Sequence, residues 1–382
     1  MSMGNPTIVL LSANTGYGHT KAGNSLEGEL LRRLPGWTVR HESIFDYANR
    51  HSKCNAESIW QLLSVTPILR TFYSAAHRLV VSRPFLTDLA MRFFEGTGER
   101  LAKHYQDVDV RLVVALHPGA AAACTFWKRD RDFILQVVAT DLVVHGFHVG
   151  LGVDRVYCDK NAILASSTVK AFAGVGRLTF TGLPVEAAFF QARKERNFGK
   201  TILVTFGAKG MGAKKHISKM IEFAYRNAGI RLLVVCGTDK LLKEFAGTLV
   251  VKRGLADRCT VYGFVSNMAE LMSEADLVVG KSGGITTGEA LASRTRLIVL
   301  GHLPGQEEYN LKILQKLGMG SYCAARKIGT VLSEELDRAA SSKIHRLATH
   351  GEQGVQAIAT SIMDALHLEV PLYPTFTPRI AV

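Results

Sequence analysis

The chain has 382 residues, of which 47% are hydrophobic and 21% are charged. This composition excludes a chain that is disordered or of low complexity throughout, and the length predicts two domains of ordinary size. The formal net charge of +13 indicates an anionic partner, such as nucleic acid or an acidic membrane surface, and says nothing about the fold.

The six cysteines are scattered, with no CxxC pair and no zinc-ligand spacing. We therefore expect structural thiols in a reducing compartment. Residues 1–20 lack the basic start of an export signal. The longest other uncharged run, 112–127, is broken by His-Pro-Gly, whereas a spanning helix needs ~20 apolar residues. We expect a protein that is soluble or that at most lies on a membrane.

Apolar runs typical of buried parallel strands alternate with helical stretches along most of the chain. Helices are expected over 214–227, 239–248 and 286–293. Strands are expected over 7–12, 111–117, 134–140, 201–207, 231–237, 276–280 and 297–301. This alternation predicts α/β domains whose parallel sheets are covered on both faces.

A polar and basic segment, 186–199, divides the chain into two blocks. We predict an N-terminal Rossmann-like domain over 1–185 and a second one over 200–355. The remaining residues, 356–382, are expected to be the end of a helix and an extended tail.

Residues 50–92 interrupt the alternation with a basic, amphipathic, helix-rich insertion. One interpretation is a set of helices packed on the sheet, with the charges on a solvated face. The other is a surface that dips into an anionic bilayer. The residues expected at such a surface are Trp60, Arg70, Phe72, Tyr73, Arg78 and Arg83.

Two glycine loops each follow a predicted strand and precede a helix, where free N–H groups favour an anion. In the loop over 14–20, His19 has a side chain suited to proton transfer, although it could simply cap the loop. Lys21 stands where a dinucleotide fingerprint has glycine. The loop over 206–212 combines Lys209 with Gly207, Gly210 and Gly212, a pattern that predicts a diphosphate cradle.

The most specific cluster spans two adjacent strand–loop–helix units. The first strand ends in Ser-Gly-Gly at 282–284, whose N–H groups can hold phosphate oxygens. Glu289 follows on the helix and can bind a ribose diol, while Gln306 and Glu307 after the next strand suit sugar hydroxyls. Each carboxylate alone could be a solvated or capping residue. Their occurrence together favours a nucleotide-sugar site.

These motifs resemble glycosyltransferase family 28, and in particular its diacylglycerol glycosyltransferase branch. The specific matches are Gly-Phe-Val-x-Asn-Met at 263–268, Ser-Gly-Gly-Ile-Thr-Thr-Gly-Glu-Ala at 282–290 and Pro-Gly-Gln-Glu-Glu-x-Asn at 304–310. Shorter matches extend over most of the chain, at 15–19, 116–118, 140–141 with His145, 181–185 and 210–212. Tyr17 departs from the pattern, because relatives often carry a third consecutive glycine there.

The resemblance implies a GT-B architecture, in which two Rossmann-like domains face each other across a cleft. It places UDP-sugar on the C-terminal domain and the acceptor on the N-terminal domain, and it implies no metal or cofactor. Phe264 and Val265 would line the uracil pocket, Glu289 would bind ribose, and Gln306 and Glu307 would bind the donor sugar. Further donor-site residues are Gly207, Gly210, Gly212, Ser282, Gly283, Gly284 and Thr287.

The sequence thus predicts an inverting glycosyltransferase that moves glucose or galactose from its UDP-sugar to diacylglycerol, in a single addition or processively. It would act as a peripheral protein at the cytoplasmic face of an anionic membrane. His19 is the expected general base or acceptor-orienting residue, and Asp141 is the second candidate. His117 and His145 are expected on the acceptor side.

Three alternatives stay open at this point. The first is transfer of N-acetylglucosamine or a uronic acid to a polyprenyl-linked or other lipid. An NAD-dependent oxidoreductase is disfavoured because the fingerprint lacks its third glycine. A nucleic-acid-binding protein is disfavoured because no recognition helix, RNP-like motif or zinc module is present, so no nucleic-acid partner is expected.

Overall fold

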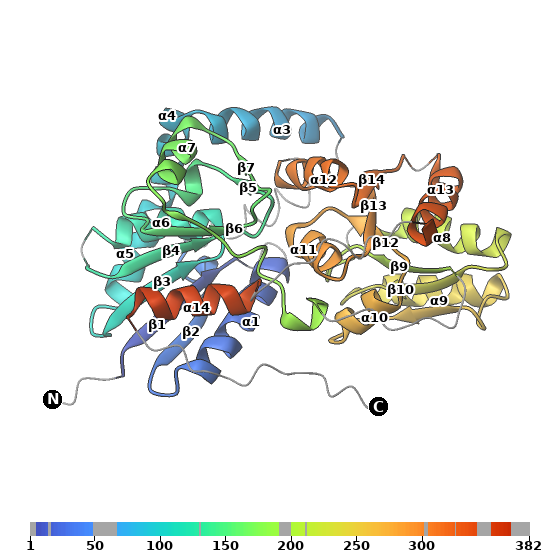
Figure 1. Cartoon of the computed structure of the whole chain (residues 1–382), viewed down its shortest axis with the longest axis horizontal. Coiled ribbons are helices and arrows are strands. Elements are labelled where there is room, and N and C mark those ends of the chain that lie inside the picture. The colour runs from blue at the N-terminus through green and yellow to red at the C-terminus, as the bar shows by residue number, and fades with distance from the viewer. Residues whose placement is uncertain are drawn as a thin grey trace.

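The computed structural model describes residues 5–13, 17–48, 67–129, 131–190, 200–210, 212–301, 305–324, 326–341 and 353–367. These residues form two α/β units that lie side by side, each built around a six-stranded sheet (Figure 1). The linker predicted at 186–199 falls mostly outside the described residues, and so does Cys54. The other five cysteines are buried.

The N-terminal sheet is parallel, with the strand order β2-β1-β3-β4-β6-β8. Its central strand β1 is buried at every position and pairs with β2 and β3. Helices α5 and α6 pack on one face, and α1 packs on the other. The strands are β1 (Thr7–Ser12), β2 (Thr38–Ser43), β3 (Val110–Ala115), β4 (Ile134–Val138), β6 (Arg155–Cys158) and β8 (Leu178–Phe180). The helices are α1 (Tyr17–Arg33), α5 (Glu95–His104), α6 (Pro118–Trp127) and α7 (Ser167–Gly174), and β5 (Val143–Val144) pairs with β7 (Ile163–Leu164).

The C-terminal sheet repeats this plan in the order β11-β10-β9-β12-β13-β14. Helices α8, α9 and α13 cover one face, while α10, α11 and α12 cover the other. The strands are β9 (Thr201–Thr205), β10 (Arg231–Val235), β11 (Cys259–Tyr262), β12 (Leu277–Lys281), β13 (Arg296–Gly301) and β14 (Gly320–Tyr322). The helices are α8 (Lys214–Arg226), α9 (Lys240–Lys252), α10 (Met268–Glu274), α11 (Gly284–Ala292), α12 (Gln306–Lys316) and α13 (Ile328–Ser341).

All seven predicted strands are present, but several end earlier than predicted. β3, β4, β9 and β10 each stop two residues before the predicted end. The residues that follow leave the sheet at its carboxyl edge, among them His117, Thr140 and Gly207, and they line a cleft between the domains. These strand ends are therefore the start of the functional loops.

The described part of the predicted insertion forms α3 (Pro67–Ser82), α4 (Pro84–Met91) and a short 3-10 turn, η2 (Arg92–Phe94). In Figure 1, α3 runs along the top of the N-terminal unit toward α12. Trp60 and the side chains of Arg70, Phe72 and Tyr73 lie outside the described residues, whereas Arg78 and Arg83 are exposed. No described helix is long and apolar enough to cross a bilayer.

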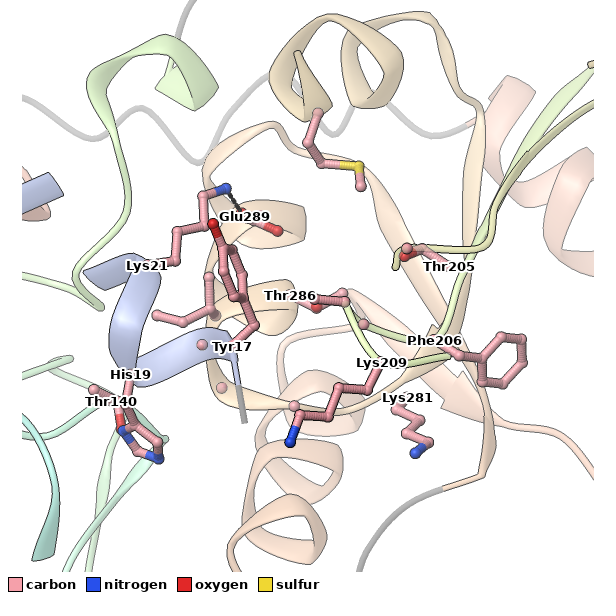
Figure 2. Close-up of a pocket in the computed structure, with 18 of the residues that line it drawn as sticks. Tyr17, His19, Lys21, Thr140, Thr205, Phe206, Lys209, Lys281, Thr286 and Glu289 are labelled. Carbon is pink, nitrogen blue, oxygen red and sulfur yellow. Dashed lines mark hydrogen bonds and ion pairs between the residues drawn. The ribbon is translucent and has the colours of Figure 1, made fainter. Parts of the chain in front are cut away.

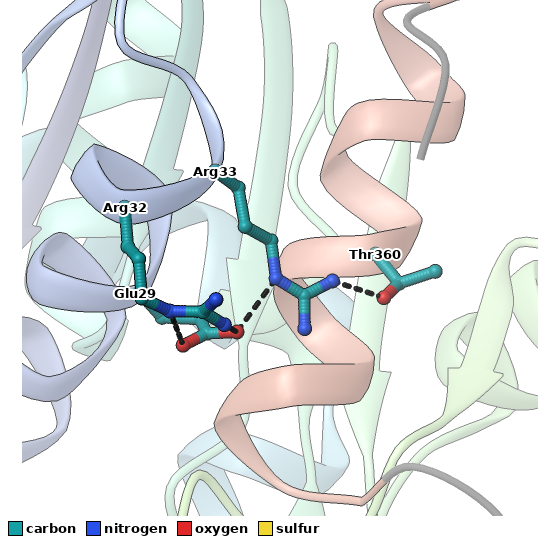
Figure 3. A network of polar contacts seen from close by, with 4 residues as sticks. All are labelled: Glu29, Arg32, Arg33 and Thr360. Atoms are coloured by element: carbon teal, nitrogen blue, oxygen red, sulfur yellow. Dashed lines mark hydrogen bonds and ion pairs between the residues drawn. The ribbon is translucent and has the colours of Figure 1, made fainter. Parts of the chain in front are cut away.

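The last described helix, α14 (Val355–Ala365), returns to the N-terminal domain and packs beside α1. Ile358 and Ile362 are fully buried in that core. At the end of α1, the Arg33 guanidinium donates from Nε to Glu29 (2.6 Å) and from Nη1 to the Thr360 hydroxyl (2.6 Å) (Figure 3). The last described helix is therefore part of the N-terminal domain, although it follows the C-terminal domain in the chain.

Candidate functional site

A cleft of about 470 Å³ lies between the two domains. It faces the carboxyl ends of the central strands of both sheets, which is where α/β proteins bind ligands. Figure 2 shows side chains from α1 on one side and from the β9 and β12 loops on the other. The predicted site residues that line it are His19, His117, Asp141, Gly207, Phe264, Val265, Gly283, Gly284, Glu289, Gln306 and Glu307.

The first turn of α11 faces the cleft directly after β12. Its N-cap is Gly283, and within the described chain no side chain caps the exposed N–H groups. A Cβ on Gly284 would lie 1.9 Å from the Thr140 carbonyl oxygen and 2.6 Å from Asp141 Oδ1. Only glycine therefore lets the two domains approach this closely. Uncapped amides at a helix N-terminus favour an anion.

Glu289 lies on α11 with only 5% of its surface exposed. Its Oε1 accepts a hydrogen bond from Lys21 Nζ at 2.5 Å, across the cleft from α1. Burial raises the pKa of Glu289, and the Lys21 ammonium opposes that rise. The carboxylate thus lies on the same helix as the uncapped N-terminal amides, and its contact with ribose stays a prediction.

The α12 helix begins at Gln306, directly after Gly305, whose φ is 93°. Gln306 and Glu307 both line the cleft, and the Glu307 carbonyl accepts from the Ser282 hydroxyl at 2.9 Å. Ser282 and Thr287 are fully buried behind the cleft wall. Gln306 and Glu307, the predicted sugar-binding pair, therefore lie in the first turn of α12. Ser282 holds the backbone of that turn through its hydrogen bond.

Phe264 lines the cleft next to Val265 and is half exposed. The Tyr17 ring from α1 meets the Phe264 ring edge-on, with centroids 5.4 Å apart. Because one aromatic ring comes from each domain, a planar base held at Phe264 would also face Tyr17.

The glycine loop after β9 contributes to the same cleft. Gly207, Gly210 and Gly212 all have positive φ, a conformation that side-chain-bearing residues rarely adopt. Gly207, Lys209 and Lys281 line the cleft, and Figure 2 shows the Lys209 and Lys281 side chains pointing in different directions. Gly210 and Gly212 are not among the lining residues, and a Cβ on Gly210 would lie 2.8 Å from Leu242. The loop thus contributes the backbone at Gly207 and the side chain of Lys209 to the cleft.

His19 projects into the cleft from α1. Its Nδ1 lies 2.8 Å from the Leu116 carbonyl oxygen, which can only accept, so Nδ1 carries the proton. Nε2 of the neutral ring is then the basic nitrogen. Burial lowers the pKa of His19, and Asp141 opposes this. Asp141 is also buried, which raises its pKa, while His19 and Asn310 oppose that shift.

His117, His145 and His148 lie near His19, and His145 and His148 are buried. The His117 ring meets the His19 ring edge-on at 4.9 Å, and His145 lies 4.1 Å from the His148 ring. Burial lowers the pKa of both His117 and His145 well below the ordinary value. His117 lines the cleft but His145 does not. Among the described residues, no cluster of three or more acidic, histidine or cysteine side chains could hold a metal ion.

Two residues that the sequence analysis did not assign to the site are central to it. Lys21 pairs with Glu289, and the fully buried Asn310 donates to both Asp141 Oδ1 (2.7 Å) and the Ser282 carbonyl (2.8 Å). Asn310 lies in the family motif at 304–310, so its presence in that motif could have indicated a role in the site. For Lys21 the sequence offered only the absence of the glycine that a dinucleotide fingerprint has at this position.

Comparisons with known proteins identify this arrangement. Residues 201–366 match the glycosyltransferase family 28 C-terminal domain. The C-terminal domain belongs to glycosyltransferase family 28. The expected family and enzyme class are therefore confirmed, and the protein is a glycosyltransferase.

Curated relatives of this glycosyltransferase match most of its length. A processive diacylglycerol beta-glucosyltransferase of Bacillus subtilis (strain 168) is 23% identical over 331 residues, which covers 82% of each chain. The protein of the same name from Bacillus mycoides (strain KBAB4) is 24% identical over 341 residues, covering 82% of this chain and 81% of the relative.

Solved structures share the fold of the glycosyltransferase at low identity. Acinetobacter baumannii MurG superposes with a TM-score of 0.60 at 16% identity, covering 94% of this chain and 99% of that one. The glycotransferase of kitacinnamycin gives a TM-score of 0.59 at 15% identity, covering 97% and 100%. The expected GT-B architecture is confirmed.

Proposed function

We propose that this glycosyltransferase moves glucose or galactose from a UDP-sugar to diacylglycerol, with inversion at the anomeric carbon. The names of the Bacillus relatives support a diacylglycerol acceptor and a β-linked product. Because UDP-hexoses carry an α-linkage, a β-product requires inversion. Addition of further sugars to the first product belongs to the same proposal.

One observation carries the donor half of the proposal. The uncapped first turn of α11 and the Glu289 carboxylate lie on one wall of the cleft, and His19 lies on the wall opposite. A nucleoside diphosphate fits that wall, with its phosphates at the helix N-terminus and its ribose at Glu289. The sugar then lies toward Gln306 and the N-terminal domain.

The proposed reaction uses His19 Nε2 as the base. The acceptor oxygen attacks the anomeric carbon, its proton passes to Nε2, and the bond from that carbon to UDP breaks with the electron pair going to the diphosphate. Asp141 stabilises the imidazolium that forms, since opposite charges are attracted in a buried site. The α11 amides and Lys209 stabilise the departing phosphate charge. That no metal takes part stays a prediction.

An exposed apolar and basic surface on the N-terminal domain supports a lipid acceptor. We define the α4 face as the exposed residues Leu79, Arg83, Phe85, Leu89, Arg92 and Phe93. Phe85 is 76% and Phe93 86% exposed. Each arginine near an anionic leaflet adds ~1 kcal/mol of attraction. We propose that the enzyme binds peripherally to the cytoplasmic face of an anionic membrane through this face.

The proposal is tested by incubating the protein with labelled UDP-glucose or UDP-galactose on anionic vesicles with and without diacylglycerol. We expect lipid-extractable label only with diacylglycerol, as one spot on a thin-layer plate if one sugar is added and a ladder if more are added. Glu289→Ala should remove the product, whereas the exposed-site control Glu244→Ala should not.

Two outcomes would contradict parts of the proposal. Release of UDP with no lipid product would retain the donor site and overturn the diacylglycerol acceptor. If neither lipid product nor UDP were released, both hexose donors would be overturned. UDP-N-acetylglucosamine or a UDP-uronic acid with a polyprenyl-linked acceptor would then be tested.

A further inference from the structure

Lys21, on α1 of the N-terminal domain, extends to Glu289 on α11 of the C-terminal domain. Its Nζ lies 2.5 Å from Glu289 Oε1 (Figure 2) and 4.9 Å from the centre of the Phe189 ring. The side chain is one quarter exposed, while that of Glu289 is 6% exposed. The contact is thus a nearly buried ion pair between helices of different domains.

A carboxylate buried to this degree needs a cation beside it to remain charged. Two charged side chains act on Glu289 among the described residues. One is Lys21 on α1, and the other is Glu186, which precedes η4 (Ala187–Phe190) and accepts from the Ser25 hydroxyl at 2.9 Å. Glu186 and burial both disfavour the charged form of Glu289. Lys21 alone of the two favours it.

The charge of Glu289 matters for the ligand proposed to bind there. An ionised carboxylate has two acceptor oxygens, whereas a protonated one carries an O–H and accepts less well. Lys21 engages Oε1, and no hydrogen bond to Oε2 is found within the described chain. One carboxylate oxygen therefore stays available for hydroxyl donors in the cleft.

The face of α1 that carries Lys21 also packs elsewhere against the C-terminal side of the cleft, which is the proposed donor site. Tyr17, one turn earlier, meets Phe264. Between them, Gly18 lies so close to α11 that a Cβ would be 3.2 Å from Ile285 Cγ1. One face of α1 thus contacts the C-terminal domain at three points: Phe264, where the base is proposed to bind, Ile285 on α11, and Glu289, where the ribose is proposed to bind.

We propose that Lys21 is a positioning residue of the donor site, which holds the Glu289 carboxylate ionised and oriented so that Oε2 accepts hydrogen bonds from the ribose diol. This inference rests on the proposed function, since it takes the ligand to be a uridine nucleotide. Ribose recognition in this chain then requires the N-terminal domain as well as the C-terminal one.

The test compares UDP with 2′-deoxy-UDP by calorimetric titration of the full-length protein. In the wild type, we expect UDP to bind ~10-fold or more tightly than 2′-deoxy-UDP, because a hydrogen bond to a charged group is lost. In Lys21→Met, this ratio should fall toward one. Lys21→Arg should restore most of it, and the exposed-lysine control Lys170→Met should leave it unchanged.

The ratio of the two affinities within one variant is unaffected by a general loss of stability. Glu289→Gln should lower the ratio as Lys21→Met does, and combining the two substitutions should lower it no further. A wild-type ratio retained in Lys21→Met would overturn the inference while leaving the donor proposal intact, even if both affinities fell. A wild-type protein that binds neither nucleotide would overturn the proposed donor and this inference together.

Discussion

Asn310 in the C-terminal domain donates a hydrogen bond from Nδ2 to Oδ1 of Asp141 in the N-terminal domain, at 2.7 Å. The same amide group donates to the Ser282 carbonyl at 2.8 Å, and its Oδ1 accepts from the Leu142 N–H at 2.7 Å. Asn310 is fully buried. One side chain therefore fixes the two domains relative to each other beside the candidate base.

Asn310→Leu should destabilise the protein. The substitution keeps the side-chain volume but leaves the Leu142 N–H and the Ser282 carbonyl without their partner, at ~1–3 kcal/mol for each buried group. We expect the free energy of unfolding in denaturant to fall by ~2 kcal/mol or more. Gln315→Leu, at an exposed position of the same helix, is the control. Equal stability of the two variants would contradict the role of Asn310.

His19→Ala should lower turnover ~10²-fold or more while UDP affinity changes little, because the base acts only on the acceptor proton. Steady-state kinetics and UDP titration measure the two effects separately. His104→Ala removes an exposed histidine of the same domain and should be nearly silent. Near-wild-type turnover in His19→Ala would remove this residue from the mechanism.

The pH dependence of turnover should report His19 as well. A base must be neutral, and burial places the pKa of His19 below its ordinary value. Activity should therefore persist below pH ~6.5 and fall only as further acidification protonates the ring. A loss of kcat on acidification that already begins above pH ~6.5, and that is absent in a His19 variant, would contradict the lowered pKa of His19.

Gly284→Ala should disable the enzyme without unfolding it. Its Cβ would collide with the backbone oxygen of Thr140, which cannot move without displacing the N-terminal domain. A shift of ~1 Å in a reacting geometry costs ~10²-fold in rate. Gly28→Ala is the matched control, since nothing lies within 4 Å of the added methyl group. Full activity in Gly284→Ala would show that the close approach of the domains is not needed.

The α4 face should control binding to vesicles. Replacing Phe85 and Phe93 by serine removes two apolar side chains, each worth ~1.5–3 kcal/mol if buried in lipid. Co-sedimentation with anionic vesicles should fall at least 10-fold, since even one such side chain is worth about that factor. Val175→Ser, at an exposed site on α7's C-cap, should have no effect. Equal binding to neutral and anionic vesicles would contradict the role of the arginines.

The parts of the fold that the sequence predicts are those with a local pattern. β1 and β9 are continuous apolar runs because both faces of each strand are covered. The strands of the two large sheets that were not predicted are β2, β6, β8, β11 and β14, which lie at or next to a sheet edge, and all but β2 have only three or four residues. In β2, β8, β11 and β14 many side chains are only partly buried, so the apolar pattern is weak, whereas β6 is buried but too short to give a clear pattern.

The candidate site also contains residues that the sequence indicates directly and residues that it does not. Gly284, Glu289 and His19 stand in motifs at the ends of predicted strands, so the sequence indicates them directly. The partners that set their chemistry are distant in the chain: Lys21 meets Glu289 across 268 positions and Asn310 meets Asp141 across 169. No local pattern encodes contacts that only the docking of two domains creates.

A crystal structure of the protein with UDP would test the central claim most directly, namely that the cleft between the domains is the donor site. We predict uracil against Phe264, ribose at Glu289, and the diphosphate at the N-terminus of α11. UDP bound outside the cleft, or the reverse orientation with its phosphates at Phe264, would contradict the account.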